Sequence, residues 1–218
     1  MYIEDSRTRV KICGITTLED GRFASGALAD FLGFIFWPGS PRFITAEAAA
    51  EIIGWTEGPE CVGVFVDQPL EEVNRMAEET GVDLVQLHGD ESVEYCRQVT
   101  KPVIKSFRVK PAMTEVDIAN MINPYLNHIA YILFDSFDKD VQGGSGKTFD
   151  WTQIEKLKEQ VPVILAGGLN AQNIAHAIET VKPFAVDVSS GVELEPGIKD
   201  FEKMTAFFEQ INNINEEW

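Results

Sequence analysis

Short apolar segments, each followed by a segment with helical spacing, repeat eight times along this chain of 218 residues. The apolar segments are rich in β-branched and aromatic residues, which is typical of buried strands. They cover residues 9–15, 31–36, 61–67, 84–88, 103–108, 131–135, 163–166 and 185–188. The expected helices cover residues 18–25, 46–54, 70–80, 92–99, 115–126, 151–160, 171–180 and 200–212. Strands that alternate with helices in this way predict a parallel sheet.

Eight such units with mostly short connections predict the fold class, which is α/β with a single (β/α)8 TIM barrel. No unit is left over, so a closed barrel is favoured over an open doubly wound sheet. We expect one domain over residues 1–218, in which residues 1–8 form a short N-terminal extension. Thr45, Asp150 and Asn170 are the expected N-caps of the helices that follow them.

Charge and hydropathy restrict the partners of the chain. The formal net charge is −17, with 35 acidic and 18 basic residues, which disfavours nucleic acid and anionic membranes as partners. No apolar segment approaches the ~20 residues of a membrane span, and the first residues lack the apolar core of a secretion signal. We therefore expect a cytoplasmic protein. The expected partner is a small molecule, and the expected assembly is a monomer or homodimer. An anionic substrate would have to be attracted by local positive charge.

Cysteine and histidine positions argue against a metal site. The three cysteines are Cys13, Cys61 and Cys96, an odd number without paired spacing, which disfavours a disulfide framework or a zinc site. The three histidines are scattered along the chain. We expect free thiols and no metal.

Small residues follow the last two predicted strands and indicate a phosphate site. These residues are Gly167 and Gly168 after one strand and Ser189, Ser190 and Gly191 after the next. They leave backbone N–H groups uncovered, and such groups bind anions. In TIM barrels the loops after the last two strands often hold a substrate phosphate. The alternative is that these are ordinary turn glycines and a strand-end cap.

Two other strand ends carry side chains suited to proton transfer. Lys11 and Cys13 alternate with apolar residues, so both should point into the barrel, and the Lys11 charge should lower the pKa of Cys13. Asp135 ends the sixth strand with no helix nearby to cap, which indicates a catalytic acid in this fold. Its neighbours Leu133 and Phe134 should raise its pKa. The alternative for Cys13 is a buried thiol that packs as a small hydrophobe.

Further polar residues lie at the same end of the barrel. Gln86 and His88 share one face of the fourth strand, and Asp187 shares a face of the eighth with Ser189. Each pair either forms hydrogen bonds within the protein, as a polar layer of the barrel, or contacts a ligand. Arg42, after the second strand, is expected to hold a carboxylate through two parallel hydrogen bonds.

The segment 137–149 is a long glycine-rich connection after the sixth strand. Its Gly146-Lys-Thr148 resembles part of a P-loop, but a P-loop requires glycine at position 141, where this chain has Val141. We therefore expect a lid that closes over the substrate.

Eight segments between Val10 and about Phe208 match one enzyme family in the family's order. They are Val10-Lys-Ile-Cys-Gly-Ile15, Gly33-Phe-Ile-Phe, Ser40-Pro-Arg-Phe-Ile44, Gly63-Val-Phe-Val66, Val85-Gln-Leu-His-Gly89, Gly143-Gly-Ser-Gly-Lys-Thr-Phe-Asp-Trp151, Leu165-Ala-Gly-Gly-Leu-Asn170 and Phe184-Ala-Val-Asp-Val-Ser-Ser-Gly-Val-Glu193. On these segments the chain resembles the phosphoribosylanthranilate isomerases of tryptophan biosynthesis. It departs from the family at Trp37 and Phe43, where tyrosine is common, and at Gly39, where lysine is common.

The resemblance implies an enzyme that converts N-(5'-phosphoribosyl)anthranilate to 1-(o-carboxyphenylamino)-1-deoxyribulose 5-phosphate. This Amadori rearrangement is an aldose–ketose isomerisation by acid–base catalysis, without metal or organic cofactor. It implies Cys13 as general base, Asp135 as general acid and Arg42 as the ligand of the anthranilate carboxylate. Lys11, His88 and Asp187 complete the expected substrate-binding residues.

Two alternatives stay open. One is another phosphosugar isomerase or epimerase barrel. A histidine-pathway isomerase should have aspartate in place of Cys13, and a metal-dependent epimerase needs histidines at strand ends, where only His88 lies. The other is a non-catalytic barrel that binds a phosphorylated metabolite, and it predicts binding without turnover.

Overall fold

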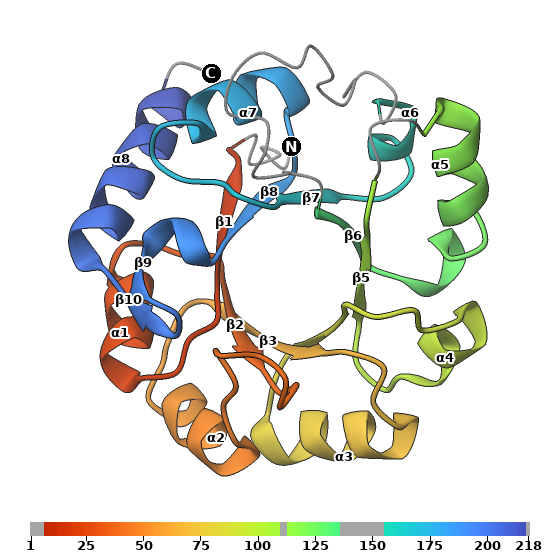
Figure 1. The fold of residues 1–218 in the computed structure, drawn as a ribbon, viewed down its shortest axis with the longest axis horizontal. Helices are drawn as coiled ribbons and strands as arrows, with labels where there is room; N and C mark the ends of the chain where they lie inside the picture. Colours follow the sequence, from red (N-terminus) through yellow and green to blue (C-terminus); the bar gives the residue numbers. More distant parts are fainter. Residues whose placement is uncertain (1–6, 110–112, 136–154, 217–218) are drawn as a thin grey trace, which may run out of the picture.

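The computed structural model describes residues 7–109, 113–135 and 155–216. Within these residues eight parallel strands form a closed barrel in chain order, surrounded by helices (Figure 1). The strands are β1 (Arg9–Cys13), β2 (Phe31–Ile35), β3 (Glu60–Phe65), β4 (Leu84–Leu87), β5 (Val103–Phe107), β6 (Tyr131–Asp135), β7 (Val163–Ala166) and β8 (Ala185–Val188). β1 pairs with both β2 and β8, which closes the sheet. The predicted TIM barrel is confirmed.

The described helices follow the strands on the outside of the barrel (Figure 1). They are α1 (Leu18–Gly26), α2 (Ala46–Gly54), α3 (Leu70–Thr80), α4 (Val93–Gln98), α5 (Glu115–Ile122), α6 (Glu155–Lys158), α7 (Ile174–Val181) and α8 (Phe201–Glu216). Two short 3-10 segments, η1 (Leu126–His128) and η4 (Ser190–Val192), follow α5 and β8. An antiparallel hairpin of β9 (Glu193–Glu195) and β10 (Ile198–Lys199) precedes α8 and was not predicted.

The start of α7 differs from the prediction. Asn170 does not cap the helix. Its Oδ1 instead accepts a hydrogen bond from the backbone N of Gln172 at 2.9 Å, which makes a local turn. The helix then begins at Ile174. Thr45 caps α2 as predicted, since its side chain accepts from the N–H of Ala48.

Several predicted features fall on residues outside the described ranges. They are the glycine-rich lid in segment 137–149, the Asp150 cap, the first residues of the helix expected over 151–160, and residues 1–6 of the N-terminal extension. The remainder of that extension contacts the barrel and α8. Arg7 Nη1 is 3.0 Å from Asp30 Oδ2, and the Thr8 N–H donates to Asn215 Oδ1 at 3.0 Å.

Side chains alternate along each strand and build two apolar cores. The outer core packs the strands against the helices and includes Val10 and Ile12. The inner core fills the barrel interior with Phe31, Val62, Leu84, Ile104, Leu133, Ile164, Ala166 and Ala185, and of these Ala166, at the end of β7, also lines the cavity described below. One step further along four strands, at the next inward position, the residue is polar: Gln86, Ser106, Asp135 and Asp187. The change from apolar to polar marks the end of the barrel where a site can form. No helix in the described ranges has both the length and the apolar character needed to cross a membrane.

Candidate active site

A cavity of ≈ 420 Å³ opens at the C-terminal ends of the strands. Of the predicted site residues, those that line it are Cys13, Arg42, His88, Asp135, Gly167, Gly168, Asp187, Ser189 and Ser190. Lys11 and Gly191 are not part of its described lining. A cavity of ≈ 460 Å³ among the N-terminal ends of β1, β2, β3 and β6 contains none of the predicted residues.

Lys11 lies one layer below Cys13, inside the barrel. Its side chain is fully buried, and its Nζ is 3.1 Å from Oδ1 of Asp187, its register partner on β8. Burial opposes the charge of Lys11, but the attraction of Asp187 outweighs this effect and raises its pKa. Lys11 is therefore an ammonium that supports the floor of the site and does not form its wall.

The structure contradicts the expected effect of Lys11 on Cys13. Cys13 is 6% exposed, and its burial raises the pKa of the thiol more than the Lys11 charge lowers it. Removing the thiol from water disfavours the thiolate, and one neighbouring ammonium does not compensate. The thiol predominates at neutral pH in this structure.

Asp135 faces the cavity from β6 and is held by a chain of polar contacts. Its Oδ2 is 3.4 Å from Nε2 of His88. On the other side of the ring, His88 Nδ1 is 3.2 Å from Gln86 Nε2. An amide nitrogen only donates, so Nδ1 accepts and the His88 proton lies on Nε2, facing Asp135. This hydrogen bond lowers the pKa of Asp135 in spite of its burial, so the predicted rise was wrong.

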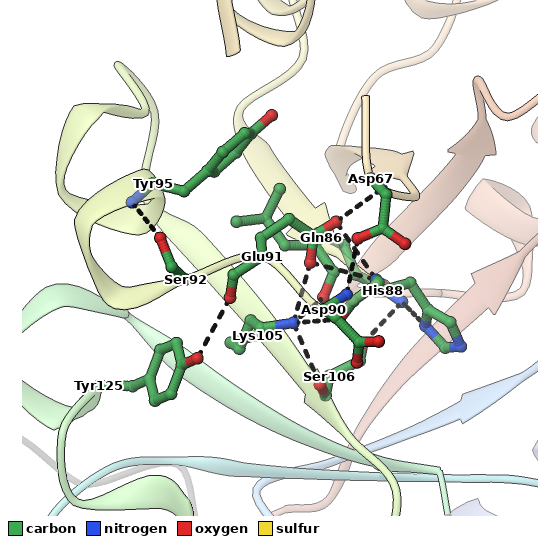
Figure 2. Close-up of polar contacts among 12 residues, drawn as sticks. Asp67, Gln86, His88, Asp90, Glu91, Ser92, Tyr95, Lys105, Ser106 and Tyr125 are labelled. Carbon is green, nitrogen blue, oxygen red and sulfur yellow. Dashed lines mark hydrogen bonds and ion pairs between the residues drawn. The ribbon is translucent and has the colours of Figure 1, made fainter. Parts of the chain in front are cut away.

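The loop after His88 is fixed by a buried ion pair, shown in Figure 2. Lys105 Nζ is 2.9 Å from Glu91 Oε2 and 2.6 Å from the Gly89 carbonyl oxygen. The Lys105 and Glu91 side chains are 3% and 2% exposed. Glu91 also accepts hydrogen bonds from the backbone N–H groups of Gly89 and Asp67. These contacts fix the strand end that carries His88. They were not predicted, because they join β5 to the loops after β3 and β4, which are separate in the sequence.

The loops after β7 and β8 form the other end of the cavity. Gly167 and Gly168 have φ angles of 95° and 63°, a region that glycine adopts without strain. Ser189 Oγ is buried and has no hydrogen-bond partner among the described residues. Such atoms are rare in folded proteins, and a ligand oxygen would satisfy this one. A Cβ at Gly191 would lie 1.9 Å from the Leu169 carbonyl oxygen. Gly191 therefore serves the close approach of the two loops.

Arg42 has a protein partner that was not predicted. Its Nε is 2.8 Å from Glu193 Oε1, and its Nη2 is 2.6 Å from Glu193 Oε2. This two-point contact raises the pKa of Arg42. Arg42 nevertheless lines the cavity, and among the described residues its guanidinium bonds only through Nε and Nη2, which leaves Nη1 for a ligand. The carboxylate of a ligand would therefore be the second anion on this guanidinium.

The three departures from the family pattern lie on the loop after β2. Trp37 lines the cavity and is 42% exposed, whereas Phe43 is exposed without lining it. A Cβ at Gly39 would lie 2.4 Å from the Trp37 ring. The absence of a side chain at Gly39 therefore makes room for the indole.

Metal ligands are not gathered at this site. The described residues contain no group of three or more histidine, cysteine, aspartate or glutamate side chains able to hold a metal ion. The chemistry that the site presents is acid–base chemistry, from the Cys13 thiol on β1 and the Asp135 carboxyl on β6, with Asp187 also in the lining and cationic and small-residue surfaces at its ends.

The chain is similar to known proteins over nearly its whole length. The family model for N-(5'-phosphoribosyl)anthranilate (PRA) isomerase matches residues 10–210. The N-(5'-phosphoribosyl)anthranilate isomerase of Citrifermentans bemidjiense is 47% identical over 210 residues, which are 95% of this chain and 98% of that protein.

Two solved structures show the same fold. One is of monomers generated from the dimeric phosphoribosylanthranilate isomerase of Thermotoga maritima, with a TM-score of 0.81, 39% identity and coverage of 94% of this chain and 99% of that chain. The other is a phosphoribosylanthranilate isomerase in complex with reduced 1-(o-carboxyphenylamino)-1-deoxyribulose 5-phosphate, with a TM-score of 0.81, 38% identity and the same coverage. The chain therefore belongs to the N-(5'-phosphoribosyl)anthranilate isomerase family.

Proposed function

We propose that the cavity at the C-terminal end of the barrel carries out the Amadori rearrangement of N-(5'-phosphoribosyl)anthranilate, with Cys13 as general base and Asp135 as general acid. The observation that carries this proposal is that Cys13 and Asp135 line one cavity from β1 and β6, on opposite sides of the barrel. A sugar held between them presents its ring oxygen to one and its C2' proton to the other.

The steps follow from these two positions. Asp135 protonates the furanose ring oxygen, and the C1'–O bond breaks to leave a protonated Schiff base. Cys13 as thiolate removes the C2' proton, which gives an enolamine. Protonation at C1' and loss of the C2' hydroxyl proton yield the aminoketose. Protons are only redistributed within the substrate and the two residues, so no external oxidant or reductant is needed. Acid–base catalysis of this kind contributes about 10²–10⁴-fold.

The protonation states set a condition on this mechanism. The pKa of Cys13 is raised and that of Asp135 is lowered, so the thiolate with a carboxylic acid is a minor form of the free protein at neutral pH. A bell-shaped pH–rate profile has the same shape for either assignment of acid and base. Variants of the two residues are therefore needed to assign the roles.

The ends of the cavity hold the two anionic groups of the substrate. Arg42 binds the anthranilate carboxylate, and the phosphate lies against Gly167, Gly168, Ser189 and Ser190. Support comes from the unpartnered Ser189 Oγ and from the relative whose structure holds the reduced product, which carries both anionic groups.

A steady-state assay tests the proposal. Phosphoribosylanthranilate is formed in situ from anthranilate, and its disappearance is followed by fluorescence, with Asp135→Asn as the inactive control. Turnover by the wild-type chain supports the isomerase. Binding of reduced product without turnover would instead indicate a metabolite-binding barrel, and turnover of another phosphosugar alone a different isomerase.

We also propose the assembly and location of the protein. A small molecule is the expected partner, without nucleic acid or membrane, in the cytoplasm. The chain acts as a monomer or homodimer, and the dimer has a precedent in the Thermotoga maritima relative. Light scattering on the purified protein distinguishes the two states.

A further inference from the structure

The β9–β10 hairpin places two buried charges behind Arg42. The Glu193 side chain is 4% exposed and that of Lys199 is 0% exposed. Glu193 Oε1 is 2.9 Å from Lys199 Nζ and 2.8 Å from Arg42 Nε, and its Oε2 is 2.6 Å from Arg42 Nη2. One carboxylate therefore joins two cations.

Lys199 has three acceptors for its three ammonium protons. Besides Glu193, they are the carbonyl oxygens of Cys13 at 2.6 Å and Ser189 at 3.3 Å. These bonds attach the hairpin to the ends of β1 and β8. The position of Lys199, and through it that of Glu193, is therefore fixed by the barrel itself.

The charges of the three side chains do not cancel. Burial lowers the pKa of Lys199 in spite of the Glu193 charge, but its three acceptors suit an ammonium. Two positive charges and one negative charge then leave one positive charge on the three side chains. Burial opposes the ionisation of Glu193, but the hydrogen bond from Arg42 and the charge of Lys199 outweigh it and lower its pKa. Without Lys199, Glu193 would neutralise Arg42. In a chain whose net charge is −17, local positive charge of this kind is what attracts an anion.

The geometry also restricts how Arg42 presents itself. A guanidinium has one bidentate edge at Nε and Nη2 and another at its two Nη atoms. Glu193 occupies the first edge. The aliphatic part of Arg42 packs on the backbone, since a Cβ at Gly14 would lie 2.7 Å from Arg42 Cδ. The second edge is left for a ligand in the cavity.

We propose that Glu193 and Lys199 are positioning residues for recognition of the substrate carboxylate. Glu193 holds Arg42 so that its outer edge is available in the cavity, and Lys199 offsets the Glu193 charge so that one positive charge is left for the ligand. This inference rests on the proposed function, because it takes the anthranilate carboxylate as the ligand of Arg42.

The test compares Glu193→Gln with Glu195→Gln. Glu195 lies on the same strand and is exposed, so its substitution removes the same charge without touching Arg42. We expect Glu193→Gln to raise KM about tenfold while kcat changes less than about threefold, because the lost interaction is made equally in ground and transition states. The Ki of anthranilate should rise by a similar factor, whereas the Ki of inorganic phosphate and both constants of Glu195→Gln should stay unchanged. A merely structural role would alter the phosphate Ki as well, and this result would overturn the inference.

Arg42→Ala separates this inference from the proposed function. An unchanged KM in Arg42→Ala would refute the carboxylate contact, and with it the orientation of substrate proposed above. A raised KM in Arg42→Ala with an unchanged KM in Glu193→Gln would refute the positioning role alone. If Glu193→Gln does not fold, Glu193→Asp is used, which keeps the charge but cannot span both cations. A KM for Glu193→Asp between those of the wild type and Arg42→Ala supports the role, and a KM equal to that of the wild type overturns it.

The charge of Lys199 is tested by a double variant. Lys199→Met leaves Glu193 to neutralise Arg42 and should raise the anthranilate Ki. Adding Glu193→Gln to Lys199→Met restores one positive charge. Glu193→Gln removes the contact to Arg42 in either background, but only in the Lys199→Met background does it also restore a positive charge to a neutral cluster. It should therefore raise the anthranilate Ki by a smaller factor there than in the wild-type background. An equal or larger factor in the Lys199→Met background would refute the offset of charge by Lys199.

Discussion

Replacing Cys13 with alanine separates a catalytic thiol from a packed one. The chain contains matched controls, because Cys61 and Cys96 are free thiols that are 4% and 2% exposed, against 6% for Cys13. Each substitution to alanine removes one buried sulfur atom, and the three should cost a similar free energy of unfolding, about 1 kcal/mol, comparable to one buried methylene. Thermal melts of the three variants measure this common structural effect.

The effect on turnover should differ between the three variants. Cys13 lines the cavity opposite Asp135, whereas Cys61 and Cys96 pack between the barrel and the helices. Loss of a general base lowers kcat by about 10²–10⁴-fold, or roughly 3–5 kcal/mol of activation free energy. Binding of the reduced product should change less than about tenfold, or about 1.4 kcal/mol, because Arg42 and Ser189 at the ends of the cavity are untouched.

Steady-state fluorescence of the anthranilate group gives kcat, and calorimetric titration with reduced product gives Kd. Near wild-type turnover in Cys13→Ala would show that Cys13 is only a packed thiol and would refute the mechanism. An equal loss of turnover in Cys61→Ala or Cys96→Ala would assign the effect to the fold.

Three further predictions concern the walls of the cavity. Arg42→Ala should raise KM far more than it lowers kcat, and Arg42→Lys should restore only part of the affinity, since an ammonium lacks the two-point contact. A rise in KM and a fall in kcat by the same factor would contradict this. Sulfate should compete with substrate, and Ser189→Ala should raise its Ki about fivefold, for a lost hydrogen bond of about 1 kcal/mol; non-competitive inhibition would place the anion elsewhere. Iodoacetamide should label Cys13 before Cys61 or Cys96, with protection by reduced product. Burial raises the pKa of the Cys13 thiol, so the labelling rate should increase as pH rises above the usual cysteine range. A labelling rate that does not depend on pH, or that reduced product does not lower, would refute the assignment of Cys13 to the site.

The architecture could be predicted from local pattern because a barrel repeats one unit. Strand residues alternate between two sides, so Lys11 and Cys13 had to face the same way. The change from Leu133 to Asp135 likewise marked where the apolar interior ends. Element boundaries were predicted less accurately, as at the start of α7. Asn170 has the residue type of an N-cap but makes a separate turn, because its side chain accepts a hydrogen bond from the N–H of Gln172 and the helix begins only at Ile174.

Contacts between distant segments were beyond the reach of sequence patterns. His88 lowers the pKa of Asp135, and Glu193 binds Arg42 from 151 residues away. Neither partner follows from spacing, because the closed barrel and its hairpin bring these segments together. The pKa of Cys13 is a similar case, since the sequence shows the nearby Lys11 charge but not the burial that outweighs it.

The sequence by itself therefore determined the barrel, the end at which the site forms and the residues that face into it, because these depend on alternation along each strand. The tertiary structure alone decided which charges meet and how strongly water is excluded from them. The contacts between charges depend on distances across the barrel, and the exclusion of water depends on burial. Together they set the protonation of Cys13 and Asp135 and the partner of Arg42.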